Sequence, residues 1–178
     1  VRVALNTTVL SVFPDKTALL SGRDFGRQSV RFSQLILATG CREIPMGALQ
    51  IAGTRPRGVY TAGQMQEMMN LHGYRPEGPV VILGSGDLGL IMARQLAEAG
   101  TEVTLVEQRS TCGGMAKNQR CLKDYPIRLI CGDTVAEVRG YPHITGCTTA
   151  KGVYLPCRML LIAAGLRPEQ ELIAGLGK

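Results

Sequence analysis

The amino-acid sequence predicts an α/β fold in which a parallel sheet is combined with antiparallel β-meanders. Two segments of the same form, residues 35–42 (LILATGCR) and 160–167 (LLIAAGLR), each hold four apolar residues followed by a glycine turn, which is typical of buried parallel strands. Short alternating runs broken by turn residues precede both segments and indicate meanders. Between the two copies, residues 80–107 show the pattern of a strand, a turn, a helix and a second strand.

Length and composition fit one globular domain or slightly more. The chain has 178 residues, of which 45% are hydrophobic and 19% are charged, as in ordinary soluble proteins. Its apolar runs are far shorter than the roughly 18 residues that a membrane helix needs, so we expect no membrane span. The start of the chain lacks the pattern of a secretion signal. The first residue is Val1, and we expect the chain to belong to a longer protein.

Six cysteines are spread along the chain without any Cys-x-x-Cys spacing. Zinc-ribbon and thioredoxin-type motifs are therefore absent, and we predict no metal site. Because no secretion signal is recognised, we expect reduced, mostly buried thiols and a cytoplasmic protein. Cys41 precedes Arg42 but has no second thiol or histidine beside it, so we interpret it as a packed thiol.

The net charge is +6, and residues 1–60 hold eight Lys or Arg against three Asp or Glu. Such a charge favours phosphates, either of a cofactor or of a nucleic acid. Proteins that bind nucleic acids usually add clustered cations and stacking aromatic residues. Here the arginines are scattered, and the chain has five Tyr, three Phe and no Trp. We therefore expect no nucleic acid as a partner, because the hypothesis of nucleic-acid binding rests on net charge alone.

The strongest motif is VVILGSGDLGLIMARQLAEAGTEVTLVE at residues 80–107. Four apolar residues form the predicted first strand, a helix extends to about Ala99, and Gly100 ends the helix. A second strand then runs from Val103 to Glu107. This order predicts a Rossmann-like dinucleotide-binding domain, and a glycine-rich turn in an unrelated α/β protein is the alternative. The turn between strand and helix comprises Gly84, Ser85, Gly86, Asp87, Leu88 and Gly89.

Each part of this motif has a physical role in holding a dinucleotide. Gly84 permits a tight turn, Gly86 lets the backbone approach a pyrophosphate, and Gly89 lets the helix lie close to the sheet. The N-terminus of the helix offers N–H groups and a positive dipole end to the phosphates. Glu107 can accept hydrogen bonds from the hydroxyls of the adenosine ribose.

The same acidic residue predicts a preference for NAD(H) over NADP(H). A 2′-phosphate near Glu107 would meet a like charge, and a charge-assisted hydrogen bond would be lost. Arg109 is the counterweight because it can turn toward a 2′-phosphate, while Gln108 is neutral. We give Glu107 more weight than Arg109, because Glu107 lies at a strand end, whose position is fixed, whereas Arg109 lies in a loop.

The two matching segments are explained by a duplication. Thr8 and Thr134 each begin a Thr-Val-x-x-Val run ahead of the apolar segment, and Gly84 lies fifty residues before Thr134. The same spacing puts the glycine turn of the first copy ahead of Val1. The sequence therefore predicts the tail of one dinucleotide-binding domain followed by a nearly complete second one. The predicted parts are residues 1–57, 58–168 and 169–178.

Three stretches, ATGCRE (38–43), RPRGVYTAG (55–63) and VVILGSGDLGLIMAR (80–94), resemble the FAD- and NAD(P)-dependent pyridine nucleotide-disulfide oxidoreductase superfamily. Within it, the chain resembles the subgroup of hydrogen cyanide synthase subunits and glycerol-3-phosphate dehydrogenase-associated flavoproteins. The resemblance implies an NAD(P)-binding domain, residues 58–168, inserted into an FAD-binding domain. Residues 1–57 would be the tail of that FAD domain, and residues 169–178 would begin the return to it. It also implies hydride transfer from NAD(P)H to FAD in the full-length parent.

The resemblance further implies which residues contact the cofactors. Thr39 and Gly40 would approach FAD, unless they form a plain strand-to-loop turn, and the backbone at Gly165 would contact the nicotinamide end of NAD(P)H. Members with thioredoxin reductase activity carry a Cys-x-x-Cys pair, which this chain lacks. No side chain is assigned as catalytic, since the cofactors hold the reactive atoms. The predicted cofactor-binding residues are Thr39, Gly40, Gly84, Ser85, Gly86, Asp87, Leu88, Gly89, Glu107, Gln108, Arg109, Val135 and Gly165.

The leading hypothesis is the NAD(P)H-binding portion of an FAD-dependent oxidoreductase, a fragment that we do not expect to act alone. Its expected partners are the remainder of the FAD domain and other dehydrogenase subunits. The alternative is a non-catalytic nucleotide-binding or assembly module of a multisubunit dehydrogenase, in which the dinucleotide only stabilises a subunit. The sequence leaves the substrate, the electron acceptor and the oligomeric state open.

Overall fold

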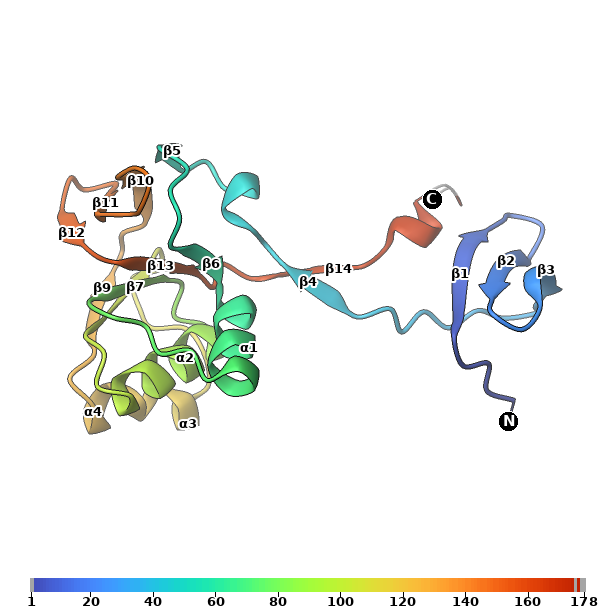
Figure 1. The fold of residues 1–178 in the computed structure, drawn as a ribbon, viewed down its shortest axis with the longest axis horizontal. Helices are drawn as coiled ribbons and strands as arrows, with labels where there is room; N and C mark the ends of the chain where they lie inside the picture. The colour runs from blue at the N-terminus through green and yellow to red at the C-terminus, as the bar shows by residue number, and fades with distance from the viewer. Residues whose placement is uncertain (1, 175, 177–178) are drawn as a thin grey trace. The chain divides into compact units, whose positions relative to one another are not determined.

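The computed structural model describes residues 2–174 and 176 and divides the chain into two compact units (Figure 1). The larger unit comprises residues 43–166, and the smaller unit comprises residues 1–42 together with 167–178. In the described part of the chain, no helix has the length and apolar character that crossing a bilayer requires.

A five-stranded parallel sheet with the strand order β6-β13-β7-β8-β9 forms the centre of the larger unit. The helices α1 to α4 follow its strands along the chain. The elements of this layer are β6 (Val59–Thr61), α1 (Ala62–His72), β7 (Val80–Leu83), α2 (Asp87–Glu98), β8 (Val103–Glu107), α3 (Ala116–Gln119), α4 (Cys121–Asp124), β9 (Arg128–Cys131) and β13 (Met159–Ile162).

The two faces of the parallel sheet pack against different layers, because successive side chains of a strand point in opposite directions. Ile82 and Leu161 share one core cluster with Leu90 of α2. Val81 and Leu160 belong to a second cluster, which the meander covers. Figure 1 shows the helices on one side of this sheet and the strands β10, β11 and β12 on the other.

The meander is a four-stranded sheet with the order β12-β11-β10-β5. Its strands β10 (Val135–Arg139), β11 (Gly146–Thr149) and β12 (Tyr154–Pro156) are antiparallel, and β5 (Ala52–Gly53) pairs with β10 in parallel. The short 3₁₀ helix η1 (Met46–Ala48) precedes β5. Met46 and Ile51 are buried in the cluster between the meander and the parallel sheet, so this early segment belongs to the larger unit.

The smaller unit contains an antiparallel meander of β1 (Thr7–Val12), β2 (Thr17–Gly22) and β3 (Gly26–Arg31), together with the 3₁₀ helix η2 (Glu171–Ile173). Strands β4 (Cys41–Glu43) and β14 (Leu166–Pro168) form a separate two-stranded sheet. Within the smaller unit, the hydroxyl of Thr39 donates to the carbonyl of Glu169 at 2.6 Å, and the N–H of Glu169 donates to the carbonyl of Gly40 at 3.0 Å.

The predicted fold class is confirmed, and the second copy follows its sequence pattern closely. The strands β7, β8 and β13, the helix α2 and the meander all lie where the pattern placed them. Ala99 caps the C-terminus of α2, and the next residue, Gly100, has a φ of +82°. This left-handed conformation favours glycine and ends the helix. The first copy also forms its predicted meander.

The buried strand predicted for residues 35–38 of the first copy is wrong. These residues have no strand, and Ile36 is 90% exposed. The reason is that no other segment of the described chain pairs with them, and an apolar run is buried only where neighbouring strands cover it.

The compact units divide the chain at 42/43 and 166/167, and Met46 and Ile51 pack into the larger unit. The domain bounds expected at 57/58 and 168/169 concern the parent protein and stay predictions. One thiol differs from expectation. Cys41, expected to be packed, is exposed because it lies just beyond the uncovered segment 35–40.

We predict that the smaller unit opens more readily than the larger one. Among the described residues of the smaller unit, Val12 and Ala18 are the only buried hydrophobic ones. In the larger unit, the strands β7, β8 and β13 are almost fully buried. Amide hydrogens of β1 to β3 should therefore exchange roughly tenfold or more faster than those of β7, β8 and β13 in hydrogen-exchange mass spectrometry. Equal protection of both groups would contradict this expectation.

Candidate functional site

A cleft of about 760 Å³ opens within the larger unit at the carboxyl ends of β7, β8 and β13. Ligand sites of open α/β sheets lie at this edge. Of the predicted residues, seven line the cleft: Gly84, Gly86, Glu107, Gln108, Arg109, Val135 and Gly165. Ser85, Asp87, Leu88 and Gly89 lie beside it, and Thr39 and Gly40 belong to the smaller unit.

The glycine turn between β7 and α2 has the geometry that its sequence predicts. Gly84 has φ +103°, and a Cβ there would collide with the carbonyl oxygen of Ala163. A Cβ on Gly89 would collide with the carbonyl oxygen of Gly84, so α2 lies as close to the turn as glycine allows. By contrast, a Cβ on Gly86 would meet nothing within 4 Å. Gly86 therefore leaves open space beside the first turn of α2.

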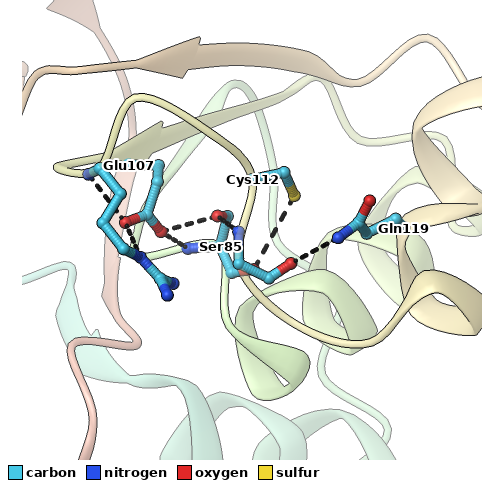
Figure 2. Close-up of polar contacts among 6 residues, drawn as sticks. Ser85, Glu107, Cys112 and Gln119 are labelled. Carbon is cyan, nitrogen blue, oxygen red and sulfur yellow. Dashed lines mark hydrogen bonds and ion pairs between the residues drawn. The ribbon is translucent and has the colours of Figure 1, made fainter.

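Glu107 ends β8 and is buried, with only 5% of the residue exposed (Figure 2). Its Oε2 accepts hydrogen bonds from the N–H of Ser85 at 2.8 Å and the hydroxyl of Ser85 at 2.6 Å. Its Oε1 accepts from the N–H and the Nε of Arg109, both at 3.0 Å. Burial by itself raises the pKa of Glu107, but the hydrogen bonds from Arg109 and Ser85 outweigh it and lower the pKa to about 2.

The role predicted for Glu107 at a ribose stays a prediction. In the structure each of its carboxylate oxygens accepts two hydrogen bonds, one oxygen from Ser85 and the other from Arg109. Glu107 therefore fixes the turn and the strand end to each other. Ser85, between the first two glycines, was the sequence signal that could have predicted this contact, because its hydroxyl can donate a hydrogen bond to a nearby buried carboxylate.

A loop that follows β8 covers the glycine turn on the side of α2. We call residues 109–119 the covering loop. The N–H of Gly113 donates to the hydroxyl of Ser85 at 2.8 Å, and the Sγ of Cys112 lies 4.0 Å from the carbonyl oxygen of Ser85 (Figure 2). The side chain of Gln119 donates to the carbonyl of Gly113 at 3.0 Å.

The covering loop also contacts Asp87, the first residue of α2. The Oδ1 of Asp87 accepts from the N–H of Met115 at 2.7 Å and from the side-chain amide of Asn118 at 2.6 Å. These two hydrogen bonds, the one from Met115 first, lower the pKa of Asp87. Sequence reasoning missed Cys112, Met115, Asn118 and Gln119, because their partners lie elsewhere in the chain and no local pattern marks them.

In residues 2–174 and 176, no group of three or more His, Cys, Asp or Glu side chains is arranged to hold a metal ion.

Comparison with known proteins places the chain in a family. Residues 1–178 match the family described as pyridine nucleotide-disulphide oxidoreductase. The chain belongs to this family. Its members are flavin-dependent oxidoreductases that use FAD and NAD(P)H, which confirms the predicted superfamily and its cofactors.

Two curated relatives cover most of the chain. It is 30% identical to hydrogen cyanide synthase subunit HcnB of Pseudomonas protegens, over 74% of this chain and 28% of the relative. It is also 30% identical to the NADH-dependent phenylglyoxylate dehydrogenase subunit epsilon of Aromatoleum evansii, over 84% of this chain and 37% of the relative. The chain thus spans little more than a third of these relatives at most.

Solved structures of the same fold include an NAD-dependent persulfide reductase from A. fulgidus, with a TM-score of 0.72 and 20% identity. That match covers 96% of this chain and 33% of the other. A ferredoxin reductase from Rhodopseudomonas palustris matches with a TM-score of 0.71 and 24% identity, over 96% of this chain and 43% of the other. At these identities the likeness establishes the fold.

We predict that Glu107→Gln removes a pH-dependent part of the stability. The pKa of Glu107 falls from 4.5 to about 2 on folding, so its contribution is complete above about pH 4.5 and is lost as the pH falls toward 2. At pH 7 the variant should lose about 2–3 kcal/mol of unfolding free energy, and this loss should shrink toward pH 3 in urea titrations. Glu102→Gln, at an exposed carboxylate, should change little at any pH. A loss for Glu107→Gln that is independent of pH would contradict the assignment.

Proposed function

We propose that the chain is the NAD(P)H-binding portion of a flavin-dependent oxidoreductase, in which the cleft positions the nicotinamide for hydride transfer to FAD. The observation that carries this proposal is the open space at Gly86, beside the first turn of α2, in a turn that is otherwise packed too tightly for any Cβ at Gly84 or Gly89. Such a space is what a pyrophosphate needs in order to reach the N–H groups of a helix.

The strand order supports one direction for the dinucleotide. In the sheet, β8 and β13 lie on either side of β7. The adenosine ribose would then lie over the end of β8, near Glu107 and Arg109, and the pyrophosphate over β7 and α2. The nicotinamide would lie over the end of β13, along the backbone of residues 163–165.

The cofactors supply the redox chemistry, since NAD(P)H donates a hydride and FAD accepts it. The residues of this chain bind and orient the dinucleotide, and none of them is needed as an acid or a base. A disulfide relay is not part of the proposal. No cysteine lines the cleft, and the chain has no Cys-x-x-Cys pair.

We infer that the partner of the smaller unit is the remainder of an FAD domain. Several of its large apolar side chains are exposed, including Leu5 and Ile36, which is the state expected of strands and segments that pack on further chain. Other subunits are further candidate partners, because the two curated relatives are themselves named as subunits. That naming also favours the second candidate function, a nucleotide-binding assembly module that does not turn over.

We propose NAD(H) as the preferred dinucleotide, and the contact between Glu107 and Arg109 adds a second ground to the charge repulsion argued from the sequence. Arg109 is the cation placed to meet a 2′-phosphate, but its Nε is held by the carboxylate of Glu107 at 3.0 Å. A 2′-phosphate would have to compete with that carboxylate for Arg109 and would be repelled by it. The name of the NADH-dependent relative agrees with this preference.

The open space at Gly86 gives a direct test of the proposed function. Gly86→Ala should fold, because a Cβ there meets nothing and its φ of −64° is ordinary for alanine. It should nevertheless weaken NADH binding roughly tenfold or more by filling the approach to the pyrophosphate. NADH fluorescence titration measures the affinity, and thermal unfolding checks the fold. Gly47→Ala is the matched control, since that glycine is also open and does not line the cleft. Unchanged NADH affinity in Gly86→Ala would refute this placement of the dinucleotide.

The cofactor preference is tested by releasing Arg109. The wild type should bind NADH more tightly than NADPH, and Glu107→Gln should reduce that preference roughly fivefold or more because the guanidinium becomes available to a 2′-phosphate. Adding Arg109→Gln should abolish the gain in NADPH affinity. Fluorescence titration of each protein with both reduced dinucleotides gives the ratios. Tighter binding of NADPH by the wild type would overturn the preference.

A further inference from the structure

We propose that Asn118 is a positioning residue of the dinucleotide site, which, together with the backbone N–H of Met115, holds the carboxylate of Asp87 away from the phosphates. The inference rests on the proposed function. It assigns a role to the covering loop that the glycine motif alone does not explain.

Asp87 creates a difficulty for phosphate binding. It is the first residue of α2 and directly follows Gly86, which lines the cleft. An acidic side chain here is favourable for the isolated helix, because the N-terminus is the positive end of the dipole. The same position is where a pyrophosphate would bind. A carboxylate turned into the cleft would therefore compete with the phosphates for the same N–H groups and repel them.

The structure resolves the conflict by turning the carboxylate toward the covering loop. Its Oδ1 accepts hydrogen bonds from Met115 at 2.7 Å and from Asn118 at 2.6 Å, and Asp87 does not line the cleft. A Cβ on Gly114 would lie 3.1 Å from the same oxygen, so glycine is the residue that leaves room for this arrangement. An aspartate is already charged at neutral pH, and its two hydrogen bonds lower the pKa of Asp87 further, so the charge must be directed elsewhere.

The covering loop is itself anchored, which allows it to act as a fixed support. Gly113 donates to the hydroxyl of Ser85 at 2.8 Å, and Gln119 donates to the carbonyls of Gly113 and Gly114 at 3.0 and 3.1 Å. Asn118 lies on α3, the short helix of this loop. The amide of Asn118 thus contacts Asp87 from a loop that is also held to the glycine turn by the hydrogen bond between Gly113 and Ser85.

Double-variant titrations with NADH test the proposal. Asn118→Ala should raise the dissociation constant of NADH roughly five- to twentyfold, since Asp87 loses one of its two donors and gains access to the phosphates. The ratio of variant to wild type should fall as salt is raised, because salt screens the repulsion. Asp87→Asn should bind NADH at least as tightly as the wild type. The double variant Asp87→Asn/Asn118→Ala should recover wild-type affinity, because it has no carboxylate to misdirect.

Gln119→Ala provides the matched control, because Gln119 supports the same loop without contacting Asp87. Any loss of affinity that it causes should persist when Asp87→Asn is added. If Asn118→Ala is equally weak with and without Asp87→Asn, or keeps wild-type affinity, the positioning role is overturned while the proposed function stands. If the wild type fails to bind NADH at all, the proposed function fails, and this inference fails with it.

Discussion

The buried carboxylate of Glu107 is the interaction on which the geometry of the cleft depends. A charge that is buried in this way is tolerated only when hydrogen-bond donors surround it. Those donors come from two places, Ser85 in the glycine turn and Arg109 at the start of the covering loop. The four hydrogen bonds to this one carboxylate therefore connect the glycine turn, the end of β8 and the covering loop. The hydroxyl of Ser85 extends the network by accepting from Gly113.

Around this network, packing decides what space remains. Gly84 and Gly89 bring the turn, α2 and the end of β13 into contact, and the sheet presents its carboxyl ends to the cleft. Gly86 is the point at which this packing stops. The site is thus formed by backbone and small side chains, which suits a function in which the protein places cofactors and the cofactors react.

The sequence predicted the larger unit well because its signals are local. The glycine spacing, the apolar strands and the helix stop all lie within residues 80–107, and each follows from short-range sterics. The hydrogen bonds that Glu107 accepts from Ser85 and Arg109 were missed, because the contact with Ser85 joins residues 22 apart in sequence and no local pattern marks it. The hydrogen bond between Asn118 and Asp87 joins residues 31 apart in sequence, without periodicity to reveal it. The buried strand predicted for residues 35–38 was wrong because the prediction used only local sequence. An apolar run is buried only if neighbouring strands are present to cover it.

The larger unit begins and ends at adjacent points, because the N–H of Ile44 donates to the carbonyl of Gly165 at 3.1 Å. A unit whose two ends meet in this way can be inserted into a loop of a host domain with little stretching of the host chain. Because its two ends lie side by side, joining residues 43–166 to a host chain would need little added linker and so would cost little loop entropy.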